Sequence, residues 1–334
     1  MAPRVAVVGA GVSGLSTAVL AQQKIPGLDV TIISDKFSPN TTGDISAGLW
    51  FPHCLQNTTS DNIYRWSSKT YERMLELWQS ADADEAGICL VPKLELSENY
   101  EPEQEFWSKI PLAFQSIDTA QTCKLTGTHK YKSGILFMTF TLQQSRYLPY
   151  LTRKFLLNGG KIQQHKVEQL QDLCGQYDIV INCSGVHARH LVGDTAVAPI
   201  RGQVKAPGLF LCYGEQATDG SYVIPKIVIL GGTHQQGNWN TNPDPQDTKN
   251  ILDKCHQLIP ALKTAEIISN RAGLRPGRTS VRIETEQLGV KKYEVIHNYG
   301  HGGSGVTLSW GCAHDVINIL QNILSSSTSI KSKL

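Results

Sequence analysis

The sequence predicts an α/β protein in which a parallel, doubly wound sheet is interleaved with a second, mostly antiparallel α+β domain. A strand pattern at residues 4–8, apolar from Val5 to Val8, leads into a glycine-rich turn and a helical pattern at 12–24. A second, mostly apolar strand pattern stands far along the chain at 177–183. The residues between these runs, and those of 200–270, carry shorter strand patterns. The parallel sheet is therefore expected to be assembled from separated pieces of the chain.

Each expected element follows from its own pattern. The helix at 12–24 places Leu15, Ala18, Val19 and Ala21 toward the sheet. Further strands are expected at 29–34, 86–98, 227–232 and 294–297, and further helices at 62–80, 147–158 and 313–324. The resulting domain assignment is 1–50, 150–200 and 275–325 for a discontinuous Rossmann-like nucleotide-binding domain, 51–149 and 201–274 for a substrate domain, and 326–334 for a polar tail.

Composition excludes several classes of protein. The chain has 334 residues, of which 40% are hydrophobic and 18% charged, as in soluble globular proteins. A net charge of +2 gives no basic surface for nucleic acid. No apolar run reaches the ~18 residues that span a bilayer. The eight cysteines form no CxxC pair, so we expect reduced, mostly buried thiols and assign no metal ligand.

The chain ends in Ser332, Lys333 and Leu334. A C-terminal SKL is the address read by the peroxisomal import receptor. The alternative is an ordinary frayed terminus. Because peroxisomes contain oxidases that make hydrogen peroxide, this tail favours an oxidase.

Gly9, Gly11 and Gly14 stand in GxGxxG register between a strand and a helix. The first glycine suits a tight turn, the second a close approach to a pyrophosphate, and the third close packing of helix on strand. The helix N-terminus then offers N–H groups to the phosphates. Asp35 follows the second strand, where a carboxylate suits ribose hydroxyls. The alternative for Asp35 is a plain loop carboxylate.

The segment YDIVINCSG, residues 177–185, favours a flavin over a nicotinamide. An apolar strand that ends in Ser184-Gly185 permits the close backbone approach that a large buried cofactor requires. A nicotinamide enzyme would also need an acid or base cluster, and none is recognisable. An NAD dehydrogenase therefore remains the weaker alternative.

Seven motifs occur in an order that resembles one family. They are VAVVGAGVSGLSTA, ISDKFSPNTTGDISAGLWFPH, DIVINCSGV, RGQV, LGGTHQQGNW, GLRPGRTSVRIE and HNYGHGGSGVTLSWG. With the SKL tail, they are similar to the FAD-dependent D-amino-acid oxidase family, which includes the D-aspartate oxidases, over essentially the entire chain. The resemblance implies non-covalent FAD and molecular oxygen as co-substrate. It also implies oxidative deamination of D-amino acids to 2-oxo acids, ammonia and hydrogen peroxide, by hydride transfer from Cα. No catalytic side chain is implied, because the cofactor carries the chemistry.

The resemblance also implies the residues that bind FAD. They form the pyrophosphate turn, the adenosine side, the flavin-lining stretch and the flavin-ring end. They are Gly9, Ala10, Gly11, Val12, Ser13, Gly14, Asp35, Lys36, Thr41, Thr42, Ala47, Gly48, Leu49, Val167, Ser184, Gly185, Arg282, Gly302, Gly303, Ser304, Gly305, Val306 and Thr307.

Substrate binding is implied for Arg275, Tyr222 and Ser304. The planar fork of Arg275 would grip the α-carboxylate through two parallel hydrogen bonds. Tyr222 would contact the same carboxylate, or else be a core tyrosine at a strand edge. Arg278 has no such role, and we expect it to be solvated.

Two histidines bear on the substrate side chain. His53 resembles the acidic-substrate branch, D-aspartate oxidase, which is slightly favoured over the neutral branch. That branch usually has arginines where this chain has His234 and Glu215. If the two histidines supply the positive charge, the D-aspartate KM should rise above about pH 7, since free imidazole has a pKa near ~6.5. A structural role for each histidine is the alternative.

The region from Arg201 to Gly231 is a few residues shorter than the resemblance implies. A reduced active-site lid, or a non-catalytic FAD-binding relative, would follow from that. An oxidase of glycine or N-methyl amino acids is a further alternative. Family members are often dimers, so a homodimer is also expected.

Overall fold

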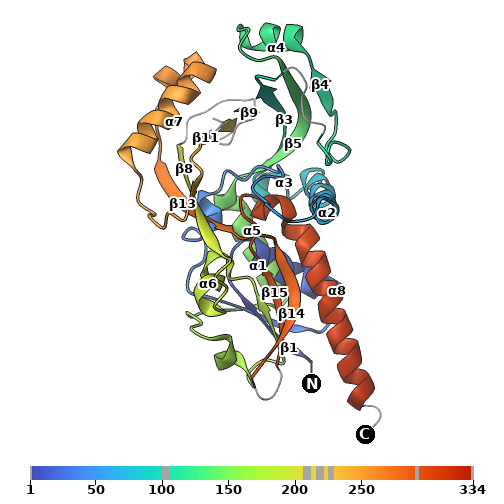
Figure 1. Ribbon diagram of the computed structural model, residues 1–334. Coiled ribbons are helices and arrows are strands. Elements are labelled where there is room, and N and C mark those ends of the chain that lie inside the picture. The colour runs from blue at the N-terminus through green and yellow to red at the C-terminus, as the bar shows by residue number, and fades with distance from the viewer. Residues whose placement is uncertain are drawn as a thin grey trace.

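The computed structural model describes residues 2–99, 105–205, 212–215, 222–224, 229–289 and 293–331. They form two sheets with helices packed around them (Figure 1). In Figure 1 the parallel sheet lies in the lower half and the antiparallel sheet in the upper half, flanked by α4 (Thr119–Thr126) and α7 (Pro245–Leu258). The predicted fold class, α/β with interleaved sheets, is confirmed.

The lower sheet has six strands among the described residues. Their order is β14 (Arg282–Leu288), β15 (Tyr293–Tyr299), β7 (Ile179–Asn182), β1 (Arg4–Val8), β2 (Asp29–Ser34) and β6 (Lys161–Gln164). All neighbours are parallel except β14 and β15. The central strands are almost wholly buried, as expected for a parallel sheet with both faces covered.

Three of the described helices stand beside this sheet, namely α1 (Val12–Lys24), α5 (Gln144–Leu157) and α8 (Gly305–Lys331). A further helix, α2 (Ser60–Trp78), lies on the other side of α8 toward the second sheet. α1 packs against both α5 and α8, and α8 also packs against α2. The four α1 residues expected to face the sheet are all buried.

The upper sheet runs in the order β12 (Gln235–Gln236), β8 (Ala198–Lys205), β11 (Ile229–Gly231), β10 (Tyr222–Ile224), β9 (Cys212–Glu215), β3 (Ile88–Ser97), β5 (Ser133–Leu142) and β4 (Gln115–Ile117). β13 (Asn270–Gly277) pairs with β8 along its whole length. β3 and β9 are parallel, and the other neighbours are antiparallel. The short helices α3 (Ala83–Ala86) and α6 (Ala188–Leu191) complete the fold.

The segment that follows Gly48 joins the two halves. Leu49 bridges to Thr141 of β5, and the Trp50 N–H donates to the Phe140 carbonyl. The N–H of the next residue, Phe51, donates to Thr307 Oγ1 in the first turn of α8 at 3.0 Å. This segment therefore fixes the start of α8 relative to the antiparallel sheet.

The final helix differs from its prediction. It was expected at 313–324 with a polar tail after it, but α8 begins at Gly305 and continues to Lys331. Its first turns are buried in the core, and this packing overrides the weak helix propensity of glycine and β-branched residues there. The SKL sequence and most of the shortened region lie outside the described residues. The boundaries of the two domains stay predictions.

Candidate active site

A cavity of about 670 Å³ connects the glycine-rich turn to the antiparallel sheet. Both halves of the fold contribute to its walls. The lining residues come from the start of α1 (Gly11, Val12, Ser13), the stretch 42–53, β3 (Lys93, Glu95), β8 (Gly202, Val204), β13 (Gly273, Arg275) and the start of α8 (Gly302, Gly303, Gly305, Val306). A cavity of this size accommodates a cofactor-sized or drug-sized ligand.

The three motif glycines have distinct surroundings. Gly9 has φ +110°, and a Cβ there would lie 2.5 Å from the Cys183 carbonyl oxygen. A Cβ on Gly14 would lie 1.9 Å from the Gly9 carbonyl oxygen, so only glycine permits this contact of helix with strand. A Cβ on Gly11 would meet no protein atom within 4 Å. Gly11 therefore faces open space in the cavity, as a residue over a pyrophosphate must.

The chemistry around this turn fits a dinucleotide. α1 begins after Gly11 without a side-chain cap, so its first N–H groups face the cavity. The start of α8 lines the same cavity, which adds a second helix N-terminus. Among the described residues, the buried hydroxyls of Ser46 and Ser184 have no hydrogen-bond partner within the protein. Ser46 lines the cavity, where a bound polar group would satisfy it.

Twelve of the predicted cofactor residues line the cavity. They are Gly11, Val12, Ser13, Thr42, Ala47, Gly48, Leu49, Gly185, Gly302, Gly303, Gly305 and Val306. Gly9, Ala10 and Gly14 lie beneath them as the support of the turn. Asp35 and Lys36 are exposed beyond the end of β2, and Val167 packs on the core at the same edge.

Several other residues that were predicted to bind FAD make hydrogen bonds within the protein instead. The N–H and the hydroxyl of Thr41 donate to the Asp44 carboxylate at 2.9 and 2.7 Å, at the start of a 3₁₀ helix (Thr42–Ile45). The Arg282 side chain contacts Glu284 at 2.6 Å and the Tyr299 hydroxyl at 2.7 Å. Ser304 is fully buried, and its hydroxyl accepts the His53 N–H at 2.7 Å. Ser304 thus orients the His53 backbone.

Arg278 is not solvated, so that expectation is wrong. Its Nε donates to Asp194 at 2.9 Å, and its side chain is 18% exposed. Asp194 also accepts a hydrogen bond from the Tyr299 hydroxyl at 2.8 Å. Local sequence does not reveal this pair, because the partners are 84 residues apart.

Arg275 projects from β13 into the cavity. Its Nη1 donates to the Thr233 carbonyl at 3.0 Å, and its guanidinium is hydrogen-bonded to the Tyr222 side chain. Gly202 on the adjacent strand lies directly against the guanidinium, so the fork is held between two strands and two polar partners. Arg275 and Tyr222, predicted to share a carboxylate, are therefore brought together.

The surroundings of His53 disfavour a positive charge on its ring. Burial, with the nearby charges of Arg275, His234 and Lys93, lowers the pKa of the His53 imidazole to about 4. A lowered pKa disfavours protonation of this ring, and the role of the two histidines in selecting acidic substrates stays a prediction. His234 lines the same cavity, with its ring 6.1 Å from that of His53.

Sequence reasoning missed the ion pair of Lys93 and Glu95, which both line the cavity. Their side chains are only 4% and 12% exposed. The Lys93 ammonium lies 4.3 Å from the centre of the Phe51 ring. The available signal was two charged residues at alternate positions within an otherwise apolar strand, a spacing that places both on one face.

His301 and Asn298 were also missed. Both line the cavity next to the glycines that begin α8, and both are buried. His301 Nε2 donates to Asn298 Oδ1 at 3.1 Å, and burial lowers the pKa of His301 to about 4. This end of the cavity is therefore lined by neutral hydrogen-bonding groups.

Within the described part of the chain, no helix is both long and apolar enough to cross a membrane.

Comparison with known proteins identifies the family. The model of a family of FAD-dependent oxidoreductases, abbreviated DAO, matches residues 4–319. Human D-aspartate oxidase is 38% identical over 327 residues, covering 95% of this chain and 94% of its own length. A D-amino acid oxidase from Dugesia ryukyuensis is 38% identical, with 96% and 98% covered.

Solved structures agree on the fold. Glycine oxidase from Bacillus cereus superposes with a TM-score of 0.77 at 18% identity, covering 96% of this chain and 95% of that one. These matches agree with the structure, in which the glycine-rich turn and the cavity beside it fit a bound dinucleotide. The chain therefore belongs to the DAO family of FAD-dependent oxidoreductases, as a homologue of the D-amino-acid and D-aspartate oxidases.

Proposed function

We propose that this protein deaminates D-amino acids oxidatively, with acidic substrates preferred. One observation carries the proposal: Arg275 lines the same cavity as the glycine-rich turn that would bind the cofactor. A guanidinium fork binds an α-carboxylate through two parallel hydrogen bonds, which fixes the adjacent Cα. Bound FAD supplies the acceptor for the hydride that leaves Cα.

The protein's own residues bind and orient the amino acid. Thr233 and Tyr222 hold the Arg275 fork, so little reorganisation is needed when the carboxylate arrives. The imino acid that forms is hydrolysed to a 2-oxo acid and ammonia, while oxygen takes up the two electrons and two protons as hydrogen peroxide. The D configuration is supported by the names of the relatives that are 38% identical.

The proposed preference for an acidic substrate rests on Lys93. Its ammonium, rather than a protonated histidine, would attract the side-chain carboxylate of the substrate. His53 lies within the electrostatic influence of both Arg275 and Lys93, so the two cations flank one region of the cavity. A D-aspartate side chain would share Lys93 with Glu95, whose carboxylate competes for the same ammonium. A neutral substrate such as D-alanine would use Arg275 alone, and this is the second candidate.

Paired variants of the ion pair test this preference. Lys93→Met should lower kcat/KM for D-aspartate at least about tenfold, because a hydrogen bond to a charged group is worth about 1.5–3 kcal/mol. It should change kcat/KM for D-alanine little. Glu95→Gln should lower the D-aspartate KM, because it removes the competing carboxylate. The double variant is the control for folding, since it leaves no buried charge of this pair unpaired.

The first experiment is anaerobic mixing of the holoenzyme with D-aspartate and with D-alanine, followed by flavin absorbance. Faster bleaching with D-aspartate is expected. Faster bleaching with D-alanine would transfer the proposal to neutral substrates. A yellow protein that neither substrate bleaches would favour the non-catalytic FAD-binding relative.

We also propose import into peroxisomes through Ser332, Lys333 and Leu334. A fluorescent protein fused to the N-terminus should reach peroxisomes, and deletion of Leu334 should abolish this. If the fluorescence stays in peroxisomes after the deletion, the proposal is refuted. That the protein forms a homodimer stays a prediction, which a light-scattering measurement of its mass would test.

A further inference from the structure

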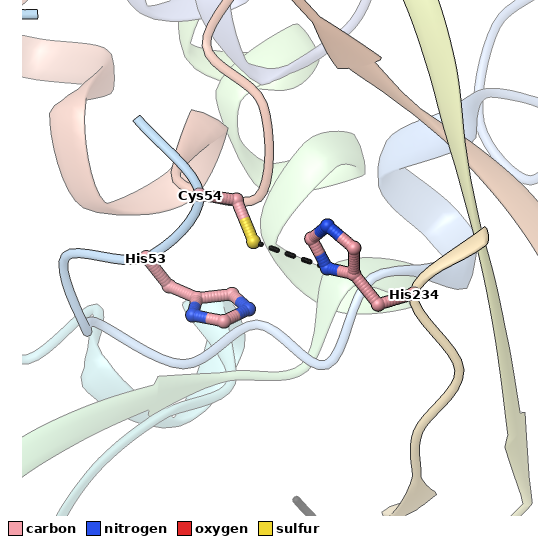
Figure 2. A group of neighbouring side chains, drawn as sticks. All are labelled: His53, Cys54 and His234. Atoms are coloured by element: carbon pink, nitrogen blue, oxygen red, sulfur yellow. Dashed lines mark hydrogen bonds between the residues drawn. The ribbon is translucent and has the colours of Figure 1, made fainter. Parts of the chain in front are cut away.

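Three side chains with metal-binding atoms meet at the wall of the cavity, which two of them, His53 and His234, line, and the proposed oxidation uses none of them as a metal ligand. They are His53, Cys54 and His234, and their ligand atoms all lie within 4.8 Å of one another. Figure 2 shows the Cys54 thiol directed at the His234 imidazole, with the His53 ring beside both. Cys54 Sγ lies 3.4 Å from His234 Nδ1.

We propose that His53, Cys54 and His234 form a binding site for a thiophilic d¹⁰ cation such as Zn²⁺, and that its occupancy excludes the amino acid. Two imidazoles and one thiolate are a donor set that Zn²⁺ prefers. Three protein ligands leave the fourth tetrahedral position open to the cavity. Inhibition of oxidation rests on the proposed function, whereas the binding of the metal does not.

The geometry suits a tetrahedral ion. For Zn–S near ~2.3 Å and Zn–N near ~2.0 Å, a tetrahedral angle separates sulfur from nitrogen by about 3.5 Å. The observed 3.4 Å between Cys54 Sγ and His234 Nδ1 therefore spans one edge of such a site without movement. The other ligand atoms lie within 4.8 Å of one another, so His53 has to approach the other two ligands by no more than about 1–1.5 Å to complete such a site.

The backbone holds two of the ligands in place. Cys54 has φ +58°, a left-handed conformation that is uncommon for a residue with a side chain. Its carbonyl lies against Gly302, where a Cβ would come within 2.1 Å of the oxygen. The His53 N–H is bound by the buried Ser304 hydroxyl at 2.7 Å. This pair of ligands thus stands on a backbone fixed by the start of α8.

Binding of the ion releases one proton to solvent. At a pH where both imidazoles are neutral, the ion displaces the Cys54 thiol proton and forms bonds to sulfur and to the two ring nitrogens, with no change of oxidation state. The charges of Arg275 and Lys93 oppose a divalent cation, so we expect micromolar rather than nanomolar affinity. His234 directly follows Thr233, whose carbonyl accepts a hydrogen bond from Arg275, so an ion on His234 would lie next to the guanidinium that binds the amino acid.

The test measures Zn²⁺ binding to the holoenzyme by equilibrium dialysis and by calorimetry in two buffers of different ionisation enthalpy. One ion per chain at this site, with about one proton released, is expected. Cys54→Ser and His234→Gln should each weaken binding at least about tenfold. FAD content and melting temperature of each variant confirm that it is folded.

The surface offers a matched control. Cys123 Sγ lies 3.7 Å from His129 Nε2, so this pair presents a thiol and an imidazole outside the cavity. Cys123→Ser should leave the pocket affinity and the activity unchanged. If Zn²⁺ binding is lost in Cys123→Ser and retained in both pocket variants, the proposal is overturned.

Inhibition provides the second readout. Zn²⁺ should raise the apparent KM for the amino acid without lowering kcat, and Cys54→Ser should reduce this effect at least about tenfold. Non-competitive inhibition would overturn the exclusion of substrate. A protein that binds Zn²⁺ through this cluster but oxidises no amino acid would refute the proposed function and leave the metal site standing.

Discussion

The Arg275 guanidinium fills the space that Gly202 leaves by having no side chain. A Cβ on Gly202 would lie 2.4 Å from Arg275 Nη1 and 2.5 Å from its Cζ. The two residues belong to adjacent antiparallel strands, β8 and β13, so the orientation of the fork is fixed by the sheet.

We therefore predict that Gly202→Ala displaces Arg275 without unfolding the protein. The Cβ meets only the end of a flexible side chain, which can move away. Because misplacement of a binding group by about 1 Å costs on the order of 100-fold, kcat/KM for the amino acid should fall by about that factor. Steady-state kinetics, with FAD content and melting temperature as controls, measure this.

Arg275→Lys is the comparison for this variant. It keeps the charge but loses the two parallel donors, so it should impair substrate binding with Gly202 intact. Wild-type KM in Gly202→Ala would contradict the role given to the contact between Gly202 and Arg275.

A second prediction distinguishes the structural role of Gly14 from the cofactor-binding role of Gly11. Gly14→Ala should destabilise the protein itself, because its Cβ would lie 1.9 Å from the Gly9 carbonyl oxygen. Gly11→Ala should fold normally, because its φ of −77° suits alanine and no protein atom lies within 4 Å of the new carbon. Only the bound cofactor would meet that carbon, so FAD affinity should fall at least about tenfold.

The measurement compares the melting temperature of apoprotein with the flavin absorbance of holoprotein for the two variants. Gly11→Ala should lose flavin but keep the apoprotein melting temperature. If Gly11→Ala also melts early without FAD, the assignment of open space above Gly11 to the cofactor is wrong.

Local pattern was sufficient for the first strand, turn and helix of the cofactor half of the fold. β1, the glycine turn and α1 lie where the sequence predicts them, because strand, turn and helix each depend on neighbouring residues. The start of α8 was misplaced, because its first turns are helical through burial rather than through propensity. Arg275 was found through the resemblance, and its contact with Tyr222 depends on sheet pairing.

The electrostatics of the site could not be predicted in the same way. The pKa of His53 falls first because of burial and then because of nearby charges such as Arg275 and Lys93, and only the fold creates both. The cluster of Cys54 and His234 joins residues 180 positions apart, which no motif spacing encodes. Long-range contacts therefore decide which residues are charged and which chemistry they share.

The last prediction concerns the buried pair of Asp194 and Arg278. Asp194 is 9% exposed and accepts hydrogen bonds from Arg278 at 2.9 Å and from Tyr299 at 2.8 Å. Burial alone raises the pKa of Asp194, but these hydrogen bonds outweigh it and lower the pKa. Asp194→Asn should cost about 3 kcal/mol of unfolding free energy at pH 7, because it leaves Arg278 without its counter-charge.

The pH dependence follows from the sign of that shift. A carboxyl with a lowered pKa in the folded state stabilises the protein fully above its unfolded pKa of about 3.9, and this contribution is lost as pH falls toward the lower folded value. The difference in urea unfolding between wild type and Asp194→Asn should therefore be constant from about pH 5 to 7 and shrink below about pH 4. Asp84→Asn, in an exposed pair with Arg146, is the control and should change stability little. A difference for Asp194→Asn that grows on acidification would contradict the lowered pKa, because it would mean that the folded protein binds the proton more tightly than the unfolded chain.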